Sequence, residues 1–489
     1  MSKCVAVFCE TSCNDCWLTR CIVGRVISIN VLPDDVLLDI FDFYVEPRGI
    51  RASFQPAKKA VEAWQSLVHV CRRWRSVVFG SPRRLNLRLV CSSWTPVRDT
   101  IDIWPGLRLI IDANSSYLHS GGVDQKGLDN IVAALEHKDR VEEIRVSSHD
   151  DSEMEKVFAA MQVPFPELII MRIERWSSAE MATVLPDSFL GGSTLHLQSL
   201  ELHRIPFPGL PKLLLSATRL VYLYLFDIPH SGYFSPEAMV TALSSLTNLK
   251  SLYLRFQSPQ SHPDRESRRP PLLARFVLPA LTILVIKGDS EYIDDLLASI
   301  DAPRLNELNI TFFNQILFDA PQFIQFISRT RGLKSPEKAH VTFDDDTASV
   351  RLTSGAGYLM VEVRCIELDW LVSSMEQVCT WCLPPLFTLE DLYIKAQGLK
   401  SNEQDNIENA LWLELLQPFT AVKNLYLSKK LAPHIVPALQ ELVGGRTTEV
   451  LPTLQNIFLE GFEPSGPVRE GIEQFVGARQ GSIAVNLWE

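Results

Sequence analysis

Residues 249–254 read LKSLYL, a six-residue pattern that recurs along the chain and decides its fold. Seven further copies read LQSLEL, LVYLYL, LTILVI, LNELNI, LEDLYI, VKNLYL and LQNIFL, and they begin at Leu197, Leu220, Leu281, Leu305, Leu389, Val422 and Leu454. Successive copies begin 23 to 33 residues apart, except for one interval of 84 residues after Leu305. A period of this size indicates an array of repeats rather than several independent domains.

Each copy has the pattern of a short strand, and helical patterns lie between the copies. The two apolar residues of L-x-L point to the same face of a strand, whereas residues 236–246 and 435–443 have apolar residues at helical spacing. A single strand and helix cannot bury their apolar faces alone, so stacked units must share one core. The predicted fold class is α/β, with an irregular leucine-rich-repeat solenoid, or horseshoe, over residues 84–489.

Weaker copies extend the array beyond the eight clear ones. Residues 141–146 (VEEIRV) and 168–173 (LIIMRI) are two such copies on the N-terminal side. The long interval after Leu305 is expected to hold one or two degenerate units of the same kind, around residues 341–343, 350–352 and 361–366.

The middle residue of L-x-L points away from the core, and it is aromatic in five of the eight copies. These residues are Tyr224, Tyr253, Tyr393, Tyr426 and Phe458. Neighbouring strands would align them into a ladder. Two interpretations remain open: a surface that binds a protein substrate, because aromatic side chains dominate binding hot spots, or cross-strand packing that only stabilises the sheet.

Residues 30–83, before the repeats, hold two apolar helical patterns. Residues 32–41 read LPDDVLLDIF, in which Pro33 suits the first turn of a helix and the aspartates suit the positive end of its dipole. Residues 64–78 follow the same spacing as two short helices or one bent helix, and Gly80 marks the end. So small a group of helices cannot bury all its apolar surface, so part of that surface is expected to bind a partner.

The order and content of these two patterns resemble an F-box. With the repeats that follow, the chain resembles the divergent family of fungal, agaricomycete-type F-box proteins with degenerate leucine-rich repeats. The resemblance implies that the F-box docks on a Skp-type adaptor, and through it on cullin and RING subunits, while the repeats bind a protein substrate. Carried over by position, the adaptor-binding residues are Leu32, Pro33, Val36, Ile40, Phe41, Leu67, Val70, Cys71 and Trp74. The stretch 45–63 departs from the family, because it is longer than the connection in compact F-boxes.

The function that this resemblance implies is that of a substrate-recognition subunit of an SCF-type ubiquitin ligase. The alternative is a non-catalytic leucine-rich-repeat scaffold or sensor outside a ubiquitin ligase, with the first helices as its cap. No enzymatic activity and no cofactor are expected, because the sequence contains no G-x-x-x-x-G-K loop, no G-x-S-x-G elbow and no H-E-x-x-H helix.

Composition excludes several other classes of protein. The formal net charge of -11 argues against nucleic-acid binding, and no run of 18 apolar residues predicts a membrane span. The predicted location is cytoplasmic or nuclear, where cysteines stay reduced.

The cysteines are expected to bind no metal. Residues 1–29 are predicted to be a disordered or mispredicted leader, although they carry five cysteines at positions 4, 9, 13, 16 and 21. A zinc site made from those thiolates would have irregular spacing and no nearby histidine. The pair Cys379 and Cys382 has the spacing of a redox motif but lacks its strand-to-helix context, so we expect a packing role.

Overall fold

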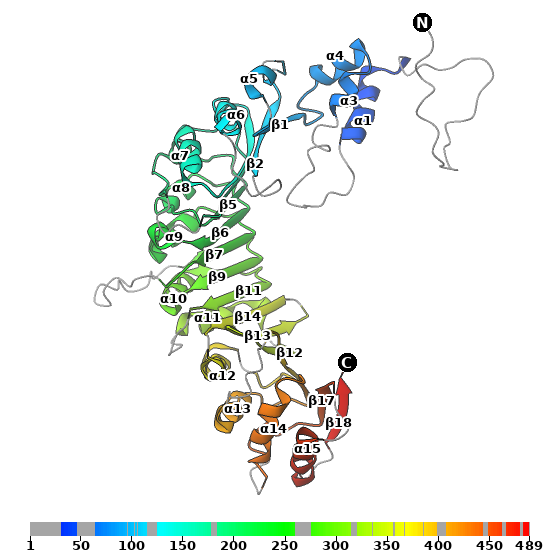
Figure 1. Cartoon of the computed structure of the whole chain (residues 1–489), viewed down its shortest axis with the longest axis vertical. Helices are drawn as coiled ribbons and strands as arrows, with labels where there is room; N and C mark the ends of the chain where they lie inside the picture. The colour runs from blue at the N-terminus through cyan, green and yellow to red at the C-terminus, as the bar shows by residue number, and fades with distance from the viewer. Residues whose placement is uncertain are drawn as a thin grey trace, which may run out of the picture. The chain divides into compact units, whose positions relative to one another are not determined.

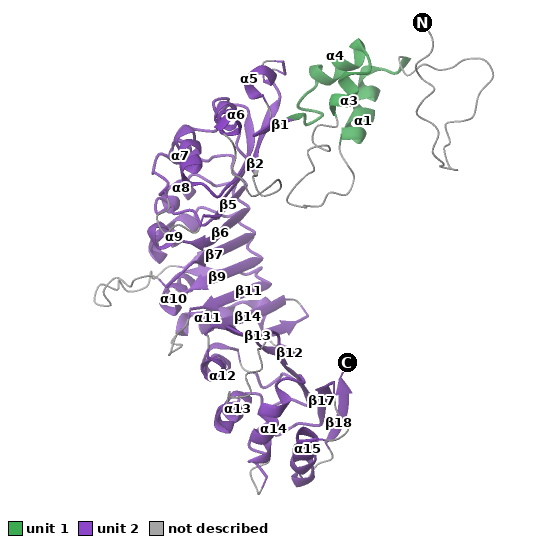
Figure 2. Cartoon of the chain, in the orientation of Figure 1, with its two compact units in different colours: residues 1–88 green, residues 89–489 purple. Residues whose placement is uncertain are grey.

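The computed structural model forms two compact units, residues 1–88 and residues 89–489 (Figure 2). The residues that it describes are 31–45, 64–94, 96–101, 103–104, 106–114, 125–177, 183–259, 275–313, 320–334, 336–355, 357–365, 367–384, 386–398, 407–443, 448–461, 466–479 and 483–488. The predicted leader with its five cysteines, and most of the long connection at 45–63, lie outside the described residues.

The described part of unit 1 contains three short helices: α1 (Asp34–Val45), α3 (Trp64–Val68) and α4 (Arg72–Gly80). The second apolar pattern therefore forms two short helices rather than one bent helix. The ring of Phe41 in α1 packs on Trp74 in α4, with 4.7 Å between the ring centroids. Arg73 joins the same two helices, because its guanidinium lies 2.6 Å from the Asp34 carboxylate.

Unit 2 is built on a 16-stranded sheet with helices along one of its faces (Figure 1). In the first part of the sheet the strand order is β1 (Arg88–Ser92), β2 (Arg108–Asn114), β3 (Val141–Ser148), β4 (Ile170–Arg175), β5 (Ser199–His203), β6 (Tyr222–Ile228), β7 (Ser251–Phe256), β9 (Ile283–Gly288) and β11 (Glu307–Phe312). The last part is β15 (Asp391–Ala396), β16 (Asn424–Leu427), β17 (Asn456–Glu460) and β18 (Ala484–Trp488). Neighbouring strands within each part, from β2 onward, are parallel.

The helices of unit 2 connect the parallel strands. They are α5 (Val97–Thr100), α6 (Gln125–Leu135), α7 (Asp151–Ala160), α8 (Leu210–Leu214), α9 (Pro236–Leu243), α10 (Ser290–Ala298), α11 (Pro321–Arg329), α12 (Leu368–Gln377), α13 (Asn409–Leu416), α14 (Ala432–Gln440) and α15 (Pro467–Ala478). All eight clear L-x-L copies form strands, and the two weaker copies form β3 and β4. The repeat pattern predicts a unit made of a strand, a crossover on one face and the next parallel strand. Unit 2 repeats this arrangement, so it is a leucine-rich-repeat-like α/β solenoid.

The long interval between copies holds strands at the three predicted apolar segments, but they form an antiparallel meander rather than degenerate repeat units. Its strands are β12 (Lys338–Phe343), β13 (Thr347–Ser354) and β14 (Gly357–Arg364), in the sheet order β11-β14-β13-β12-β15. Strand β13 is antiparallel to both of its neighbours, while β14 is parallel to β11 and β12 is parallel to β15. Only short turns join the three strands, and a parallel connection would need a crossover of a dozen or more residues.

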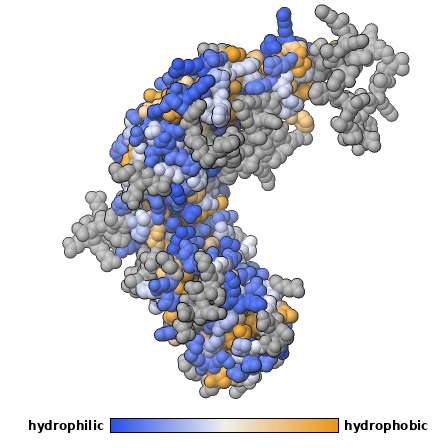
Figure 3. Space-filling view, in the orientation of Figure 1, coloured by the Kyte–Doolittle hydropathy of each residue, from blue (hydrophilic) through white to orange (hydrophobic). Residues whose placement is uncertain are grey.

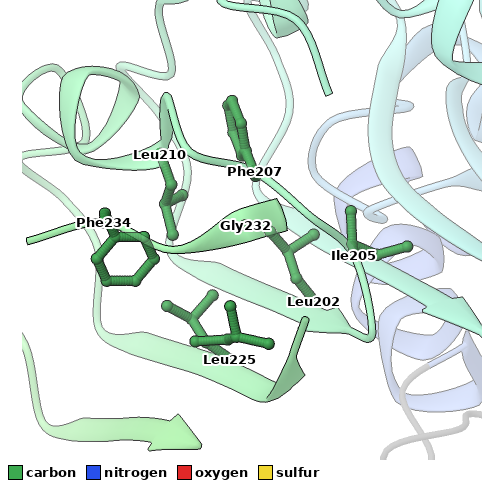
Figure 4. Close-up of a pocket in the computed structure, with 8 residues that line it drawn as sticks. Leu202, Ile205, Phe207, Leu210, Leu225, Gly232 and Phe234 are labelled. Atoms are coloured by element: carbon green, nitrogen blue, oxygen red, sulfur yellow. The ribbon is translucent and has the colours of Figure 1, made fainter. Parts of the chain in front are cut away.

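The leucines of the repeats form one continuous buried cluster that extends from Leu89 to Ile483. A small cavity of about 10 Å³ interrupts this core between two repeats, lined by Leu202, Ile205, Phe207, Leu210, Leu225, Ile228, Gly232 and Phe234 (Figure 4). A water molecule needs roughly that volume and two or more polar partners. The side chains of the lining are all apolar, and the volume is too small for a ligand, so this is a packing gap in the core rather than a ligand site. Among the described helices, none has the length and hydrophobicity that would span a bilayer.

Candidate protein-interaction surfaces

The face of the sheet opposite the helices, here called the open face, carries the five predicted aromatic residues. The strand register places Tyr224 beside Tyr253, and it places Tyr393, Tyr426 and Phe458 in one row. Between the two groups, the same row of the sheet holds Val285, Asn309, Met360 and Arg351. The structure therefore brings the five residues together as two groups rather than as one continuous ladder.

The C-terminal group contains a fourth ring, which the sequence analysis missed. His340 lies on β12 in register with Tyr393, and their ring centroids are 4.4 Å apart at an interplanar angle of 12°. The stack continues from Tyr393 to Tyr426 at 4.1 Å and from Tyr426 to Phe458 at 4.4 Å, again with nearly parallel rings. We call His340, Tyr393, Tyr426 and Phe458 the four-ring stack. His340 directly precedes the apolar segment 341–343, and that position is the sequence signal that could have identified it.

Trp488 of β18 covers part of the four-ring stack. Its ring meets Tyr393 and Tyr426 at 63° and 72°, with centroid separations of 5.9 and 5.6 Å, and the ammonium of Lys395 lies 4.6 Å from its ring centroid. Burial, with a hydrogen bond that the Tyr393 hydroxyl donates to Tyr426, raises the pKa of Tyr393 to about 12. The ring faces in this stack are occupied by one another. A partner would meet ring edges and hydroxyl groups, so cross-strand packing accounts for much of what the stack does.

The central aromatic group lies on β6 and β7. Tyr222, Tyr224 and Phe226 follow one another on β6 with centroid separations of 6.1 Å, and Tyr253 of β7 meets Tyr224 edge to face at 4.9 Å. Tyr222 is exposed, and the other three are half-buried. This group offers more accessible aromatic surface than the four-ring stack.

Charged side chains on the N-terminal part of the open face are paired with one another. Arg145 lies 2.5 Å from Glu143, and Arg172 pairs with Glu174 and, at 3.5 Å, with Glu201. Burial raises the pKa of Glu201, an effect that the neighbouring Arg172 partly offsets. These pairs leave little uncompensated charge on β3, β4 and β5.

In unit 1, helix α1 is apolar on two sides. Leu37, Leu38 and Phe41 are buried among the helices of the unit. A second set of apolar residues, at the helical spacing i, i+4, i+7 and i+8, is exposed to solvent: Val36, Ile40, Phe43 and Tyr44, with 41% of Ile40 and 61% of Phe43 exposed. We call this second set the α1 apolar face. Hydrophobic residues reach the surface of unit 1 in the space-filling view (Figure 3).

The nine predicted adaptor-binding residues divide into three classes by burial. Pro33, Val36, Ile40 and Val70 are exposed, Leu32, Cys71 and Trp74 are half-buried, and Phe41 and Leu67 are buried. Cys71 has a structural role as well, because its Sγ accepts a hydrogen bond from the Trp74 backbone N–H at 3.4 Å and so caps α4. Phe43 was not among the nine, although its helical spacing from Val36 and Ile40 could have identified it.

The structure offers no metal site in the residues that it describes, where no three histidine, cysteine or acidic side chains cluster. Cys379 and Cys382 are buried and form no disulfide, and burial raises the pKa of the Cys379 thiol. A buried, protonated thiol is a poor nucleophile, which agrees with the packing role expected for this pair.

Comparison with known proteins gives no family. No family model matches the chain, and no curated protein matches it. Among solved structures, it is similar to the leucine-rich repeat-containing protein LegL7 from Legionella pneumophila, with 12% identity over 81% of this chain and 100% of that one and a TM-score of 0.25. A TM-score this low means that the two folds superpose poorly, so the solenoid assignment depends on the strand register described above.

Proposed function

We propose that this chain is the substrate receptor of an SCF-type cullin-RING ubiquitin ligase. In this proposal unit 1 docks on a Skp-type adaptor through the α1 apolar face and Val70, and the open face of unit 2 holds a protein substrate. The chain carries out no chemistry of its own. It brings the substrate close to a ubiquitin-conjugating enzyme that the other subunits recruit, and proximity of this kind raises the rate of transfer.

The observation that carries the proposal is that α1 is apolar on both of its sides while only one side is buried. Contiguous apolar side chains on a protein surface mark an interaction site, and they are costly to leave in water. Two members of this face, Val36 and Ile40, coincide with positions that the F-box resemblance assigns to the adaptor, and so does the exposed Val70 outside α1. Phe41 and Leu67 would support that surface from within rather than touch the adaptor.

Affinity purification of the tagged full chain tests the proposal. The wild type should recover a Skp-type adaptor and a cullin, and an Ile40→Glu, Val70→Glu double variant should lose both. Both side chains are exposed, so the variant should keep the wild-type circular dichroism spectrum. Changing Trp74 would be less informative because its ring packs on Phe41.

The matched control is Val163→Glu in unit 2, because Val163 is 40% exposed and Ile40 is 41% exposed. This control should recover the adaptor as well as the wild type does. Recovery of neither subunit by the wild type would overturn the proposal in favour of a scaffold or sensor. Recovery of the adaptor without cullin would contradict the ligase role alone.

A further inference from the structure

Two basic side chains lie next to each other in the middle of the open face without ion-pair partners. Arg255 of β7 and Lys287 of β9 are in direct register on adjacent parallel strands. Lys287 is only 7% exposed. Within the described part of the chain neither side chain makes a hydrogen bond or an ion pair. Each instead approaches an aromatic ring: Arg255 lies 6.0 Å from the centroid of Phe226, and Lys287 lies 5.3 Å from that of Phe313.

The acidic residues nearby already have other partners. Asp227 lies 3.6 Å from His203 and 3.7 Å from Arg204, and Glu362 lies 3.4 Å from Arg364. The charged groups that act on Lys287 are Arg255 and Arg364 on the positive side and Asp227 and Glu362 on the negative side. With Lys287 itself, this group holds three positive and two negative charges, and burial followed by the charge of Arg364 lowers the pKa of Lys287.

Elsewhere on the sheet the chain pairs its buried charges. Glu143 pairs with Arg145, Glu174 pairs with Arg172, and the buried Arg175 forms two hydrogen bonds to Asp151. A buried charge without a partner destabilises the folded state, and so do like charges directly across neighbouring strands. Most of the Lys287 side chain is buried, and the half-buried Arg255 lies directly across from it, so the fold alone does not explain why two basic residues stand here.

We infer that Arg255 and Lys287 form an anion-binding site on the open face, which takes a carboxylate or phosphoryl group from an acidic segment of the bound protein. A guanidinium can hold such a group with two parallel hydrogen bonds, and an ammonium adds a point charge beside it. The neighbouring Phe226 and Phe313 rings exclude water, which strengthens both interactions. The inference depends on the proposed function only in taking the open face as the surface that binds a partner.

Fluorescence anisotropy with the full chain tests the site. Three labelled degenerate peptide pools share one design but carry phosphoserine, glutamate or serine at a fixed central position. We expect at least one acidic pool to bind more tightly than the serine pool. Lys287→Met and Arg255→Gln should each weaken that binding by about tenfold or more, since truncating one partner of a charge pair leaves the other charge without its partner. If only the phosphoserine pool binds more tightly than the serine pool, the ligand is a phosphoryl group. If both acidic pools bind equally well, a carboxylate is sufficient for binding.

The matched control is Lys156→Met, because Lys156 is a lysine in helix α7, outside the open face, and hydrogen-bonds to Gln125. It should leave peptide binding unchanged. Equal binding of all three pools by the wild type would overturn the inference. So would full retention of affinity by Lys287→Met.

Thermal unfolding separates a binding role from a structural one. Lys287→Met should raise the melting temperature of the free chain because it removes a buried unpaired charge. Inorganic phosphate should raise the melting temperature of the wild type and not that of the variant. A lower melting temperature in Lys287→Met without any phosphate effect in the wild type would show a structural lysine and overturn the inference. The Lys287→Met variant should still recover the adaptor, so this inference and the proposed function can fail separately.

Discussion

His340 shows how one titratable residue ties the meander to the repeats that follow it. The imidazole ring stacks on Tyr393 at the end of the four-ring stack. Burial, followed by the positive charges of Lys395, Arg351 and Lys338, lowers the pKa of His340. The neutral ring therefore belongs to the folded state, and a proton on it would weaken the stack.

Acid should destabilise the wild type more than a His340→Phe variant, in which the ring remains but cannot titrate. Because the pKa of His340 is lower in the folded than in the unfolded state, the unfolded chain binds the proton first. The neutral His340 ring contributes fully to the stability of the folded state above about pH 6.5, the pKa of histidine in the unfolded chain. This contribution is lost as the pH falls from there toward the pKa of His340 in the folded state. The measurement is the urea midpoint of both proteins between about pH 8 and about pH 5. His203, whose pKa is also lowered by burial, is present in both proteins, so their difference isolates His340. Identical pH profiles would show that His340 does not titrate with folding.

At the scale of the element, the meander is held against the repeats by a close approach of two backbones. The Tyr358 backbone N–H of β14 donates to the Asn306 carbonyl oxygen at 2.8 Å, just before β11. Gly357 permits this approach, because a Cβ atom there would collide with the same carbonyl oxygen. A backbone that cannot move aside makes even one added methyl group costly.

Gly357→Ala should destabilise unit 2 by roughly 1–3 kcal/mol, since β14 must shift away from β11 to admit the methyl group. Urea denaturation followed by circular dichroism measures the change. The control is Gly355→Ala, because the nearest atom to a Cβ at that position is 3.9 Å away. This control should be neutral or slightly stabilising, by roughly 0.5 kcal/mol, through the lower entropy of the unfolded chain. Equal effects of the two variants would mean that the β11–β14 junction adapts to the added group.

The same elements show how far sequence reasoning reaches. Each L-x-L copy predicts its own strand because the two leucines must share one face. The spacing between copies is long enough for a crossover, so it predicts that successive strands are parallel. The meander strands also alternate apolar and polar residues, so their existence was visible but their direction was not. The signal for antiparallel pairing lay in the short connections between these strands, which begin at Asp344 after β12 and at Gly355 after β13. Neither connection is long enough to hold the crossover helix that a parallel pair requires. In α1 the helical period identifies Val36, Ile40 and Phe41 as apolar positions. When a helix is apolar on both of its sides, however, periodicity alone does not show which side is buried.

On the scale of the whole molecule, the proposal assigns two separate binding tasks to two compact units. The α1 apolar face belongs to unit 1, and the anion-binding site proposed at Arg255 and Lys287 belongs to unit 2. Each unit has its own buried side chains, such as Phe41 in the first and Leu252 in the second. A surface variant in one unit should therefore leave binding at the other intact. Loss of either task should nevertheless stop modification of the substrate, because transfer of ubiquitin requires both at once.

Cells in which the chain is replaced by the Ile40→Glu, Val70→Glu variant or by Lys287→Met should accumulate overlapping sets of proteins. Quantitative proteomics measures both sets against cells with the wild type, with Val163→Glu and Lys156→Met as controls that should change neither. Proteins that accumulate in both are candidate substrates, and their acidic segments would supply peptides for the anisotropy measurement. Disjoint sets would mean that the two surfaces do not act on one substrate. Accumulation in the Lys287→Met cells alone would favour a scaffold that binds its partner without an adaptor.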